Sequence, residues 1–181
     1  MKQIYVITGA NGHLGSTIIR YLSREDCLVR GLLLPSENHE AFGNVKYYKG
    51  DITDLESMDV IFSGTEGYEV IVIHTAGLVS IEDKITPNLY DVNVNGTKNV
   101  ISMCRKYRAR RMLYVSSVHA IAEGDGKAVI HETTSFSTRV AMLLRKQRHH
   151  RPCWMLSMRG WMQSSCILPV SSGRLTTAGT T

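Results

Sequence analysis

Short apolar runs alternate with segments of helical periodicity along the first part of the chain. Buried parallel strands are continuous apolar runs, whereas a helix that covers a sheet repeats its apolar residues every three or four positions. The helical segments are residues 13–24, 54–62 (with Thr53 as the expected N-cap) and 90–107. The expected strands are Gln3–Thr8, Leu28–Leu34, Val45–Tyr48, Glu69–His74 and Met112–Ser116. Strands that alternate with helices predict an α/β fold with a parallel, doubly wound sheet.

This pattern ends near residue 135. All 16 acidic residues precede residue 133, whereas residues 133–181 carry 7 of the 21 lysines and arginines. Residues 141–159 have neither a helical nor a strand period. We therefore divide the chain into a folded domain over 1–135 and an atypical basic tail over 136–181, which is expected to be poorly ordered. The sheet would then be C-terminally incomplete, and its exposed apolar edge predicts marginal stability or aggregation.

The composition excludes several classes of protein. A hydrophobic content of 43% with a net charge of only +5 is not that of a disordered chain. No apolar run approaches about 18 residues, so no membrane span is expected, and the absence of a secretory leader favours the cytoplasm. His119 and His131 have no recognisable partner, and no metal site is suggested. The cysteines show no regular spacing and are predicted to be reduced thiols: Cys27, Cys104, Cys153 and Cys166.

The clearest candidate for a ligand site is a glycine-rich segment between the first strand and the first helix. It reads Thr-Gly-Ala-Asn-Gly-His-Leu-Gly over residues 8–15. Glycine lets the backbone turn tightly and lets a pyrophosphate approach the free N–H groups and the positive end of the helix dipole. In this strand–turn–helix context we predict a dinucleotide site rather than an ordinary flexible turn. The predicted cofactor contacts in it are Gly9, Asn11, Gly12, His13, Leu14 and Gly15.

Four further motifs follow in the order in which a known family has them. They are Gly50–Asp54 after the third strand, His74–Gly77 at the end of the fourth, Asn93–Asn99 on the next helix, and Tyr114–Ser117 at the end of the fifth strand. Together with the glycine-rich segment, they resemble the extended short-chain dehydrogenase/reductases, in the NAD-dependent epimerase/dehydratase branch. Within that branch, the motifs are most similar to those of the dihydroflavonol-reductase and hydroxysteroid-dehydrogenase-like members. The resemblance implies a Rossmann-type fold and NAD or NADP as the cofactor.

The resemblance also implies roles for individual residues. Asp51 and Ile52 would contact the adenine, and Ser117 would be the catalytic serine that donates a hydrogen bond to the substrate carbonyl. The other cofactor-binding positions would be His74, Thr75, Ala76, Gly77, Asn93, Val115 and Ser116. Simpler interpretations stay open beside these roles. Asp51 could start a helix, Asn93 and Asn99 could be polar positions on a solvated helix face, and the paired serines could form a turn.

The choice between NAD and NADP is open at this point. An acidic residue at the end of the second strand would bind the ribose hydroxyls, and an arginine there would meet a 2′-phosphate. Neither occupies the expected place, because Arg30 comes earlier in the strand and Glu37 comes slightly late.

The proton-transfer pair that the resemblance implies is missing. In the family, Tyr-x-x-x-Lys follows the catalytic serine, and its tyrosine acts as general acid/base beside a lysine that lowers its pKa. Here no tyrosine follows Tyr114, and Met142 stands four residues before Lys146. We hypothesise a frameshift in the gene near residues 136–140. Reading the tail one frame over permits Tyr-x-x-x-Lys within residues 141–146 and His-Pro-Ser-Gly within residues 166–174.

A native basic tail is the alternative to a frameshift. Its seven basic residues, with Trp154 and Trp161, could then bind an acidic partner or a nucleic acid. Because the charges are scattered and no stacking platform is evident, nucleic acid is not the expected partner.

Two functions remain from the sequence. The first is that of an NAD(P)-dependent oxidoreductase or epimerase acting on a hydroxyl or ketone of a small molecule, with this chain lacking the Tyr/Lys pair and only binding the cofactor. The second is a non-catalytic dinucleotide-binding sensor or regulatory module. The partner in the first is a small-molecule substrate, and a homodimer is compatible with the family.

Overall fold

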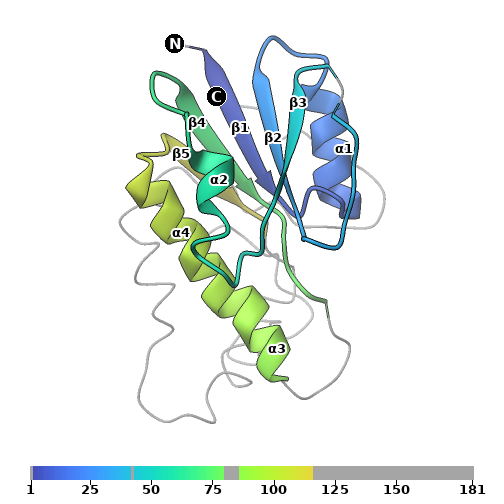
Figure 1. Cartoon of the computed structure of the whole chain (residues 1–181), viewed down its shortest axis with the longest axis vertical. Coiled ribbons are helices and arrows are strands. Elements are labelled where there is room, and N and C mark those ends of the chain that lie inside the picture. The colour runs from blue at the N-terminus through green and yellow to red at the C-terminus, as the bar shows by residue number, and fades with distance from the viewer. Residues whose placement is uncertain (1, 42, 80–85, 116–181) are drawn as a thin grey trace, which may run out of the picture.

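The computed structural model describes residues 2–41, 43–79 and 86–115. Their centre is a parallel sheet in the strand order β3-β2-β1-β4-β5 (Figure 1). The strands are β1 (Gln3–Thr8), β2 (Leu28–Leu33), β3 (Val45–Lys49), β4 (Glu69–His74) and β5 (Arg111–Tyr114). Each apolar run of the sequence has thus become a strand, which confirms the predicted doubly wound α/β architecture.

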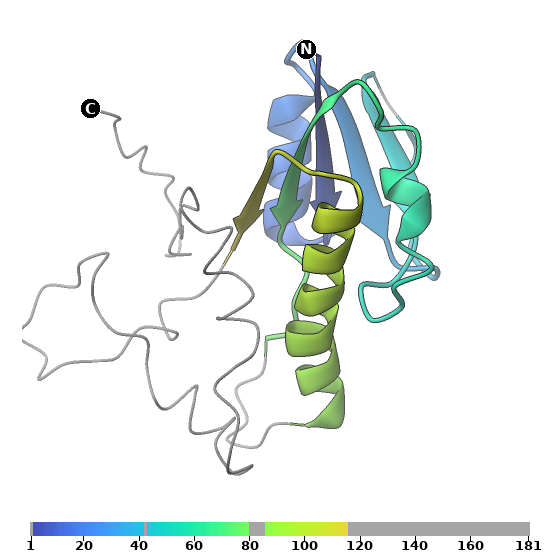
Figure 2. The ribbon, with the colours of Figure 1, turned by 90° about the vertical axis from the view of Figure 1, so that its left-hand side faces the viewer.

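Helices cover the two faces of this sheet. Helix α1 (His13–Leu22) lies on one face, and α2 (Asp59–Phe62) and α4 (Thr97–Lys106) lie on the other (Figure 2). Two segments lead directly into α4, namely α3 (Pro87–Tyr90) and the π-helical segment η1 (Asp91–Gly96). Thr86 caps the start of this long helix, because its hydroxyl accepts a hydrogen bond from the Leu89 N–H at 3.1 Å.

Each face of the sheet has its own apolar core. Between the sheet and α1 the buried side chains include Ile7, Ile19 and Leu33. The larger core, between the sheet and α2 with α4, includes Phe62 and Val100. Burial on both faces explains why the strands read as continuous apolar runs rather than as alternating patterns.

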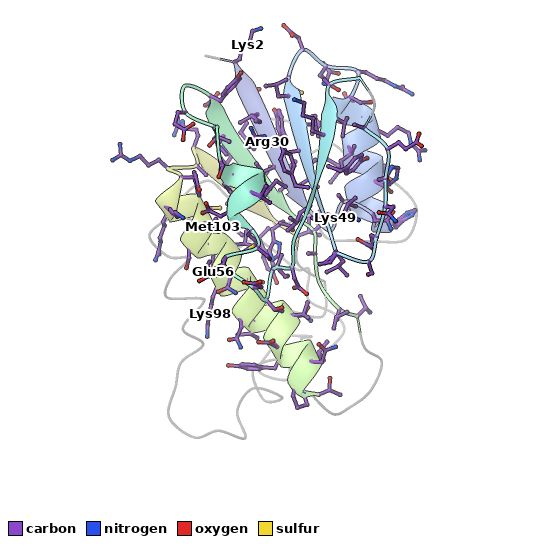
Figure 3. The ribbon with its side chains drawn as sticks, in the orientation of Figure 1. Lys2, Arg30, Lys49, Glu56, Lys98 and Met103 are labelled. Atoms are coloured by element: carbon purple, nitrogen blue, oxygen red, sulfur yellow. The ribbon has the colours of Figure 1, made fainter. Side chains whose placement is uncertain are left out.

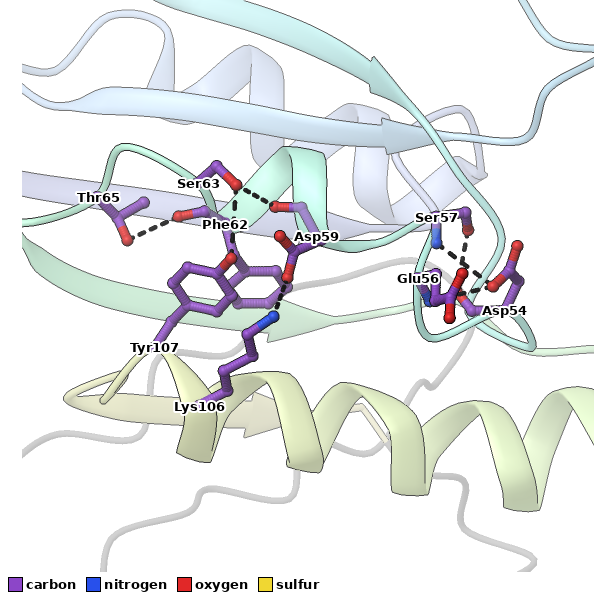
Figure 4. Close-up of polar contacts among 9 residues, drawn as sticks. All are labelled: Asp54, Glu56, Ser57, Asp59, Phe62, Ser63, Thr65, Lys106 and Tyr107. Atoms are coloured by element: carbon purple, nitrogen blue, oxygen red, sulfur yellow. Dashed lines mark hydrogen bonds and ion pairs between the residues drawn. The ribbon is translucent and has the colours of Figure 1, made fainter.

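The link between α2 and α4 closes the second core from outside. Lys106 pairs with Asp59, and the Tyr107 ring stacks on Phe62 with 5.5 Å between ring centroids. The Ser63 hydroxyl lies 3.4 Å from the Tyr107 hydroxyl. Figure 4 shows these contacts joining the end of α4 to both ends of α2. This end of the molecule is therefore held by polar contacts at the surface together with the stacking of Tyr107 on Phe62.

The predicted helix over residues 54–62 is wrong in its first half. Residues 55–58 form a turn, and the helix begins only at Asp59. Thr53 is not its N-cap, because the Thr53 N–H and hydroxyl both donate to Asp51. Asp54 takes the next two N–H groups, those of Glu56 and Ser57, at 3.0 and 3.3 Å (Figure 4). The carboxylates of Asp51 and Asp54 thus accept backbone N–H groups in a turn, in competition with a helical start at residue 54.

Other boundaries differ by a few residues. The predicted helix over 90–107 begins earlier, at Pro87, and α1 ends at Leu22 rather than at residue 24. Strand β5 ends at Tyr114, so the predicted strand residue Ser116 lies outside the described residues, as does Ser117. The domain boundary near 135, the tail over 136–181, His119, His131, Cys153 and Cys166 also lie outside them.

Candidate dinucleotide-binding site

The chain reverses its direction across the sheet between β1 and β4. Strands β2 and β3 lie on one side of β1, and β4 and β5 lie on the other. The last residue of β1, Thr8, pairs with Leu32 of β2 and with His74 of β4. In open α/β sheets, ligands bind beside such a switch point, at the carboxyl ends of the strands. We call the loops 9–12, 50–53 and 75–79 at this end the carboxyl edge.

The glycine-rich turn is closed by its own backbone. Gly9 has a φ of +68°, and its carbonyl accepts the Gly12 N–H at 3.0 Å. A Cβ on Gly15 would lie 2.1 Å from the Gly9 carbonyl oxygen, and one on Gly9 would lie 2.8 Å from the Ala76 nitrogen. These two positions therefore have no room for any side chain, which argues against an ordinary flexible turn.

Helix α1 presents an uncapped N-terminus at this turn. Gly12 is its N-cap residue and has no side chain to cap the helix, and the first turn contains no acidic residue. Asn11 and His13 are exposed beside it, while Leu14 is half-buried. Backbone N–H groups and the positive end of the helix dipole therefore face an open surface, which suits an anion such as a pyrophosphate.

The loop after β4 forms the wall opposite the glycine-rich turn. The Thr75 hydroxyl donates to the Thr8 carbonyl at 2.7 Å, and the Ala76 N–H donates to the Thr8 hydroxyl at 3.3 Å. Gly77 and Leu78 follow and are exposed. Side-chain bonds to the end of β1 thus hold this loop against the glycine-rich turn.

Asn93 holds the far end of the same loop. Its amide donates to the Leu78 carbonyl at 2.9 Å, and its Oδ1 accepts the Leu78 N–H at 2.8 Å. The alternative of a solvated helix position does not describe Asn93. Because both polar ends of its side chain already have a partner, its contribution to a ligand is to fix the loop.

The loop after β3 is held in a similar way by α4. Asn99 donates to the carbonyls of Ile52 and Thr53 at 2.9 and 3.2 Å. Ile52 is buried, and a Cβ on Gly96 would lie 2.7 Å from its side chain. Asn99 is therefore also no solvated helix position. Asp51 closes a turn in this loop through Thr53, and the helix predicted to begin there starts several residues later.

His74 lies beneath these loops rather than on their surface. Its ring is fully buried, with Nδ1 2.7 Å from the Thr8 hydroxyl and Nε2 3.0 Å from the Thr97 hydroxyl. Burial lowers the pKa of His74 to about 4, so the imidazole is neutral at physiological pH. The Tyr114 ring packs beside it with 5.5 Å between centroids. Any effect of the His74 side chain on a ligand is therefore indirect.

Glu37 returns to the glycine-rich turn although it follows β2 by four residues. Its Oε1 accepts from the Asn11 amide at 3.2 Å, and its Oε2 accepts the Leu34 N–H at 2.9 Å. The carboxylate is therefore held at the tip of β2, where sequence spacing alone did not put it. The signal that could have found it is the Pro-Ser turn before it, which bends the chain back.

Arg30 is committed elsewhere. Its guanidinium donates to the carbonyls of Ile61, Ser63 and Gly64 at 2.8, 2.6 and 3.3 Å. It also lies over the Tyr48 ring, 5.3 Å from the centroid. Figure 3 shows Arg30 away from the carboxyl end of the sheet, whereas Lys49 lies nearer to it. The Lys49 ammonium bonds Asn38 at 2.9 Å.

Three further predictions touch the described residues. Val115 follows β5, and its N–H donates to the His74 carbonyl at 3.1 Å, so it lies at the carboxyl end of the sheet. Cys27 and Cys104 are free thiols, and burial raises the pKa of Cys104 to about 12. Among the helices within residues 2–41, 43–79 and 86–115, none is long and apolar enough to cross a membrane.

A parallel doubly wound sheet with a glycine-rich turn at its switch point defines a Rossmann-type dinucleotide-binding protein. The profile of the 3-beta hydroxysteroid dehydrogenase/isomerase family matches residues 6–150, and the chain belongs to this family. The predicted membership of the extended short-chain dehydrogenase/reductases, in their epimerase/dehydratase branch, is thereby confirmed.

Curated relatives agree with this assignment. The chain is 32% identical over 133 residues to sterol demethylase protein B of Methylococcus capsulatus, covering 72% of this chain and 39% of that one. It is 30% identical over 130 residues to a putative dihydroflavonol 4-reductase of Synechocystis, covering 70% and 36%. The chain thus spans between a third and two fifths of the length of the curated relatives it matches.

Solved structures share the fold. The Thermus thermophilus UDP-glucose 4-epimerase, solved in complex with NAD, superposes with a TM-score of 0.68 at 18% identity, over 90% of this chain and 53% of that one. The protein gox2253 superposes with a TM-score of 0.69 at 23% identity, over 93% and 51%.

Proposed function

We propose that this chain binds NAD or NADP at the carboxyl edge and carries the cofactor half of an oxidoreductase or epimerase that acts on a hydroxyl or ketone of a small molecule. The single observation that carries the proposal is the tight glycine-rich turn beside the uncapped N-terminus of α1. Membership of the 3-beta hydroxysteroid dehydrogenase/isomerase family supports the same reaction class.

Each loop of the carboxyl edge suits one part of a dinucleotide. The pyrophosphate would lie on the backbone of Gly9–Gly15, and the adenine would lie against Asp51 and Ile52. Thr75–Gly77 would line the opposite wall, and Val115 with Ser116 would approach the nicotinamide. Bound there, the nicotinamide would accept or supply a hydride. Ser117 would hold the substrate carbonyl through its hydroxyl.

Glu37 favours NAD over NADP in this proposal. Its carboxylate, held by Asn11, is suited to accept hydrogen bonds from the ribose hydroxyls and would repel a 2′-phosphate. Arg30 is occupied by three carbonyls near α2 and so is not free to bind that phosphate.

A titration of the whole chain with NADH tests the proposal. Gly12→Ala is the informative variant, because Gly12 has a φ of −69° that alanine also adopts and a Cβ there would meet only the Gly9 carbonyl oxygen, at 3.2 Å. The new Cβ would take space that the proposal gives to the pyrophosphate. We expect NADH to bind about tenfold more weakly or worse, which corresponds to a loss of at least about 1.4 kcal/mol of binding free energy.

Gly67→Ala is the control at the opposite end of the sheet, where a Cβ meets nothing within 4 Å and alanine costs stability only through the φ of +83°. It should leave NADH binding unchanged. Absence of NADH binding by the wild-type chain, or equal binding by Gly12→Ala, would overturn the proposal.

A second candidate function is a dinucleotide-binding module without catalysis. The observation that favours it is the absence of any tyrosine after Tyr114, and hence of a Tyr-x-x-x-Lys pair. A turnover assay on ketones with NADH separates the two, because activity of this chain above background contradicts the non-catalytic module. The nucleotide sequence of codons 130–181 tests the proposed frameshift, which requires Tyr-x-x-x-Lys and His-Pro-Ser-Gly in the shifted frame.

A further inference from the structure

A buried chain of hydrogen bonds runs beneath the carboxyl edge. It begins at the Ala76 N–H, which donates to the Thr8 hydroxyl at 3.3 Å, and continues from that hydroxyl to His74 Nδ1 at 2.7 Å. On the other side of the ring, Nε2 lies 3.0 Å from the Thr97 hydroxyl, which donates to the Asn93 carbonyl at 2.8 Å. These hydrogen bonds therefore connect β1, through His74 of β4, to η1 and α4.

One assignment of protons pairs every polar group of this hydrogen-bonded chain, and it starts from the Thr97 hydroxyl donating to the Asn93 carbonyl. The Thr97 hydroxyl gives its proton to Asn93, so its oxygen must accept from the ring, and Nε2 carries the imidazole proton. Nδ1 is then unprotonated and accepts the Thr8 hydroxyl proton, which leaves the Thr8 oxygen to accept the Ala76 N–H. A neutral His74 protonated on Nε2 satisfies all the groups, whereas the opposite tautomer would take the Thr97 proton away from Asn93 for Nε2 and leave the Thr8 hydroxyl proton without this acceptor.

The residues at the ends of this chain are those that hold the loops of the site. Thr8 leads into the glycine-rich turn, and Asn93 holds Leu78 at the far end of the opposite wall. The two walls touch, since a Cβ on Gly9 would lie 2.8 Å from the Ala76 nitrogen. A shift of a few tenths of an ångström in either wall would therefore change the space between them.

We infer that His74, as its Nε2–H tautomer, is a positioning residue that fixes the spacing between the glycine-rich turn and the 75–78 loop. The inference rests on the proposed function, because its consequence is the affinity for a dinucleotide. His74 does this by joining Thr8 to Thr97 and does not itself touch the ligand, since its ring is fully buried.

Thr97→Val is the sharpest variant for a test. Thr97 is 3% exposed on α4, so its hydroxyl has no direct contact with a bound dinucleotide, and valine keeps its shape. Thr65→Val is the matched control, because Thr65 is also a buried threonine, 4% exposed, whose hydroxyl bonds only the Phe62 carbonyl at the other end of β4. The measurements are NADH affinity and unfolding by urea of the whole chain, with ¹⁵N spectra of the His74 ring in the wild type.

The expected result separates positioning from stability. Both variants should lower the free energy of unfolding, Thr97→Val by more because it leaves the buried His74 Nε2–H without its acceptor, but only Thr97→Val should weaken NADH binding, by about tenfold. The ¹⁵N spectra should show a proton on Nε2 and none on Nδ1. A proton on Nδ1, or equal NADH affinity in the two variants, would overturn the inference while leaving the proposed function intact. Failure of the wild-type chain to bind NADH would instead overturn the proposed function and this inference with it.

Discussion

Glycines at the two ends of the sheet have different reasons to be glycine. At the carboxyl edge and on the helices packed against it, Gly9, Gly15 and Gly96 have no room for a Cβ, which would lie 2.8, 2.1 and 2.7 Å from its nearest neighbour. At the opposite end, Gly64 and Gly67 have φ values of +68° and +83°, and a Cβ would meet only the Arg30 guanidinium at 3.9 Å on Gly64 and nothing within 4 Å on Gly67. The first group is needed for close packing between loops, and the second only for a turn.

The difference shows where the molecule requires rigid geometry. Close backbone packing at the carboxyl edge is joined by side chains that bond to backbone atoms of the next loop, as Asn93 and Asn99 do. The opposite end has one such contact as well, from the Arg30 guanidinium to the carbonyls of Ser63 and Gly64, but it also relies on exposed ion pairs such as that between Lys106 and Asp59. A site that must match a ligand needs the first kind of contact, since exposed ion pairs add little to rigidity or stability.

The largest effect should come from Gly15→Ala. The new Cβ would lie 2.1 Å from the Gly9 carbonyl oxygen, so the turn or the start of α1 must move. We expect a loss of about 3 kcal/mol in the free energy of unfolding, together with loss of NADH binding. Gly67→Ala, which incurs only the cost of its left-handed backbone, should lose about 1 kcal/mol by urea unfolding. Equal losses in the two variants would remove the contrast between the two ends.

Acid should destabilise the carboxyl edge through His74. Folding lowers the pKa of His74 from 6.5 to about 4, so the unfolded chain binds the proton more tightly. The stability from this residue is complete above pH 6.5 and is lost as the pH falls towards 4, by about 3 kcal/mol in total. Urea unfolding over this range measures it. In His74→Asn, whose amide does not titrate, this part of the slope should vanish, and an unchanged slope would refute the assignment.

A smaller effect is expected for the cofactor preference. Glu37→Gln removes the charge that Asn11 holds at the tip of β2. NADH should bind about tenfold more weakly and NADPH more tightly, because charged acceptors form stronger hydrogen bonds and repel a phosphate. Glu40→Gln is the control, because Glu40 is an exposed residue of the same loop between β2 and β3. Titrations with both cofactors give the ratio, and a ratio that Glu37→Gln leaves unchanged would contradict this role.

The smallest effect should come from the opposite end of the sheet. Asp59→Asn breaks the pair with Lys106, whose side chains are 42% and 60% exposed. We expect Asp59→Asn to lose less stability than Gly67→Ala, and this loss should disappear at high salt. NADH affinity should not change. A change in NADH affinity would show that the two ends of the sheet are coupled.

The strands and the glycine-rich turn could be predicted because their signals are local. Continuous apolar runs mark strands buried on both faces, and β1 and β4 have the predicted bounds. The spacing of Gly12 and Gly15 is equally local, since a Cβ on either would meet the Gly9 carbonyl oxygen of the same turn. Where sequence neighbours decide the structure, the sequence was sufficient.

The remainder depends on contacts between distant segments. The late start of α2 follows from Asp51 and Asp54 capturing backbone donors, in competition with a helical pattern that residues 54–62 also satisfy. Glu37 reaches the site only because the chain folds back onto Asn11, 26 residues earlier in the sequence. The burial of His74 requires α4 to pack over β4, and no local sequence motif predicts this contact.

The separation along the chain between the two walls of the site has a consequence for how the protein folds. The contacts that join Thr8 to His74, Thr75 and Ala76 span 66 to 68 residues. Closing so long a loop is slow because its entropy must be lost before the contacts form, whereas the turn at Gly9–Gly12 forms locally. During refolding, secondary structure should therefore return before the ability to bind a dinucleotide, which depends on the docking of β4 beside β1.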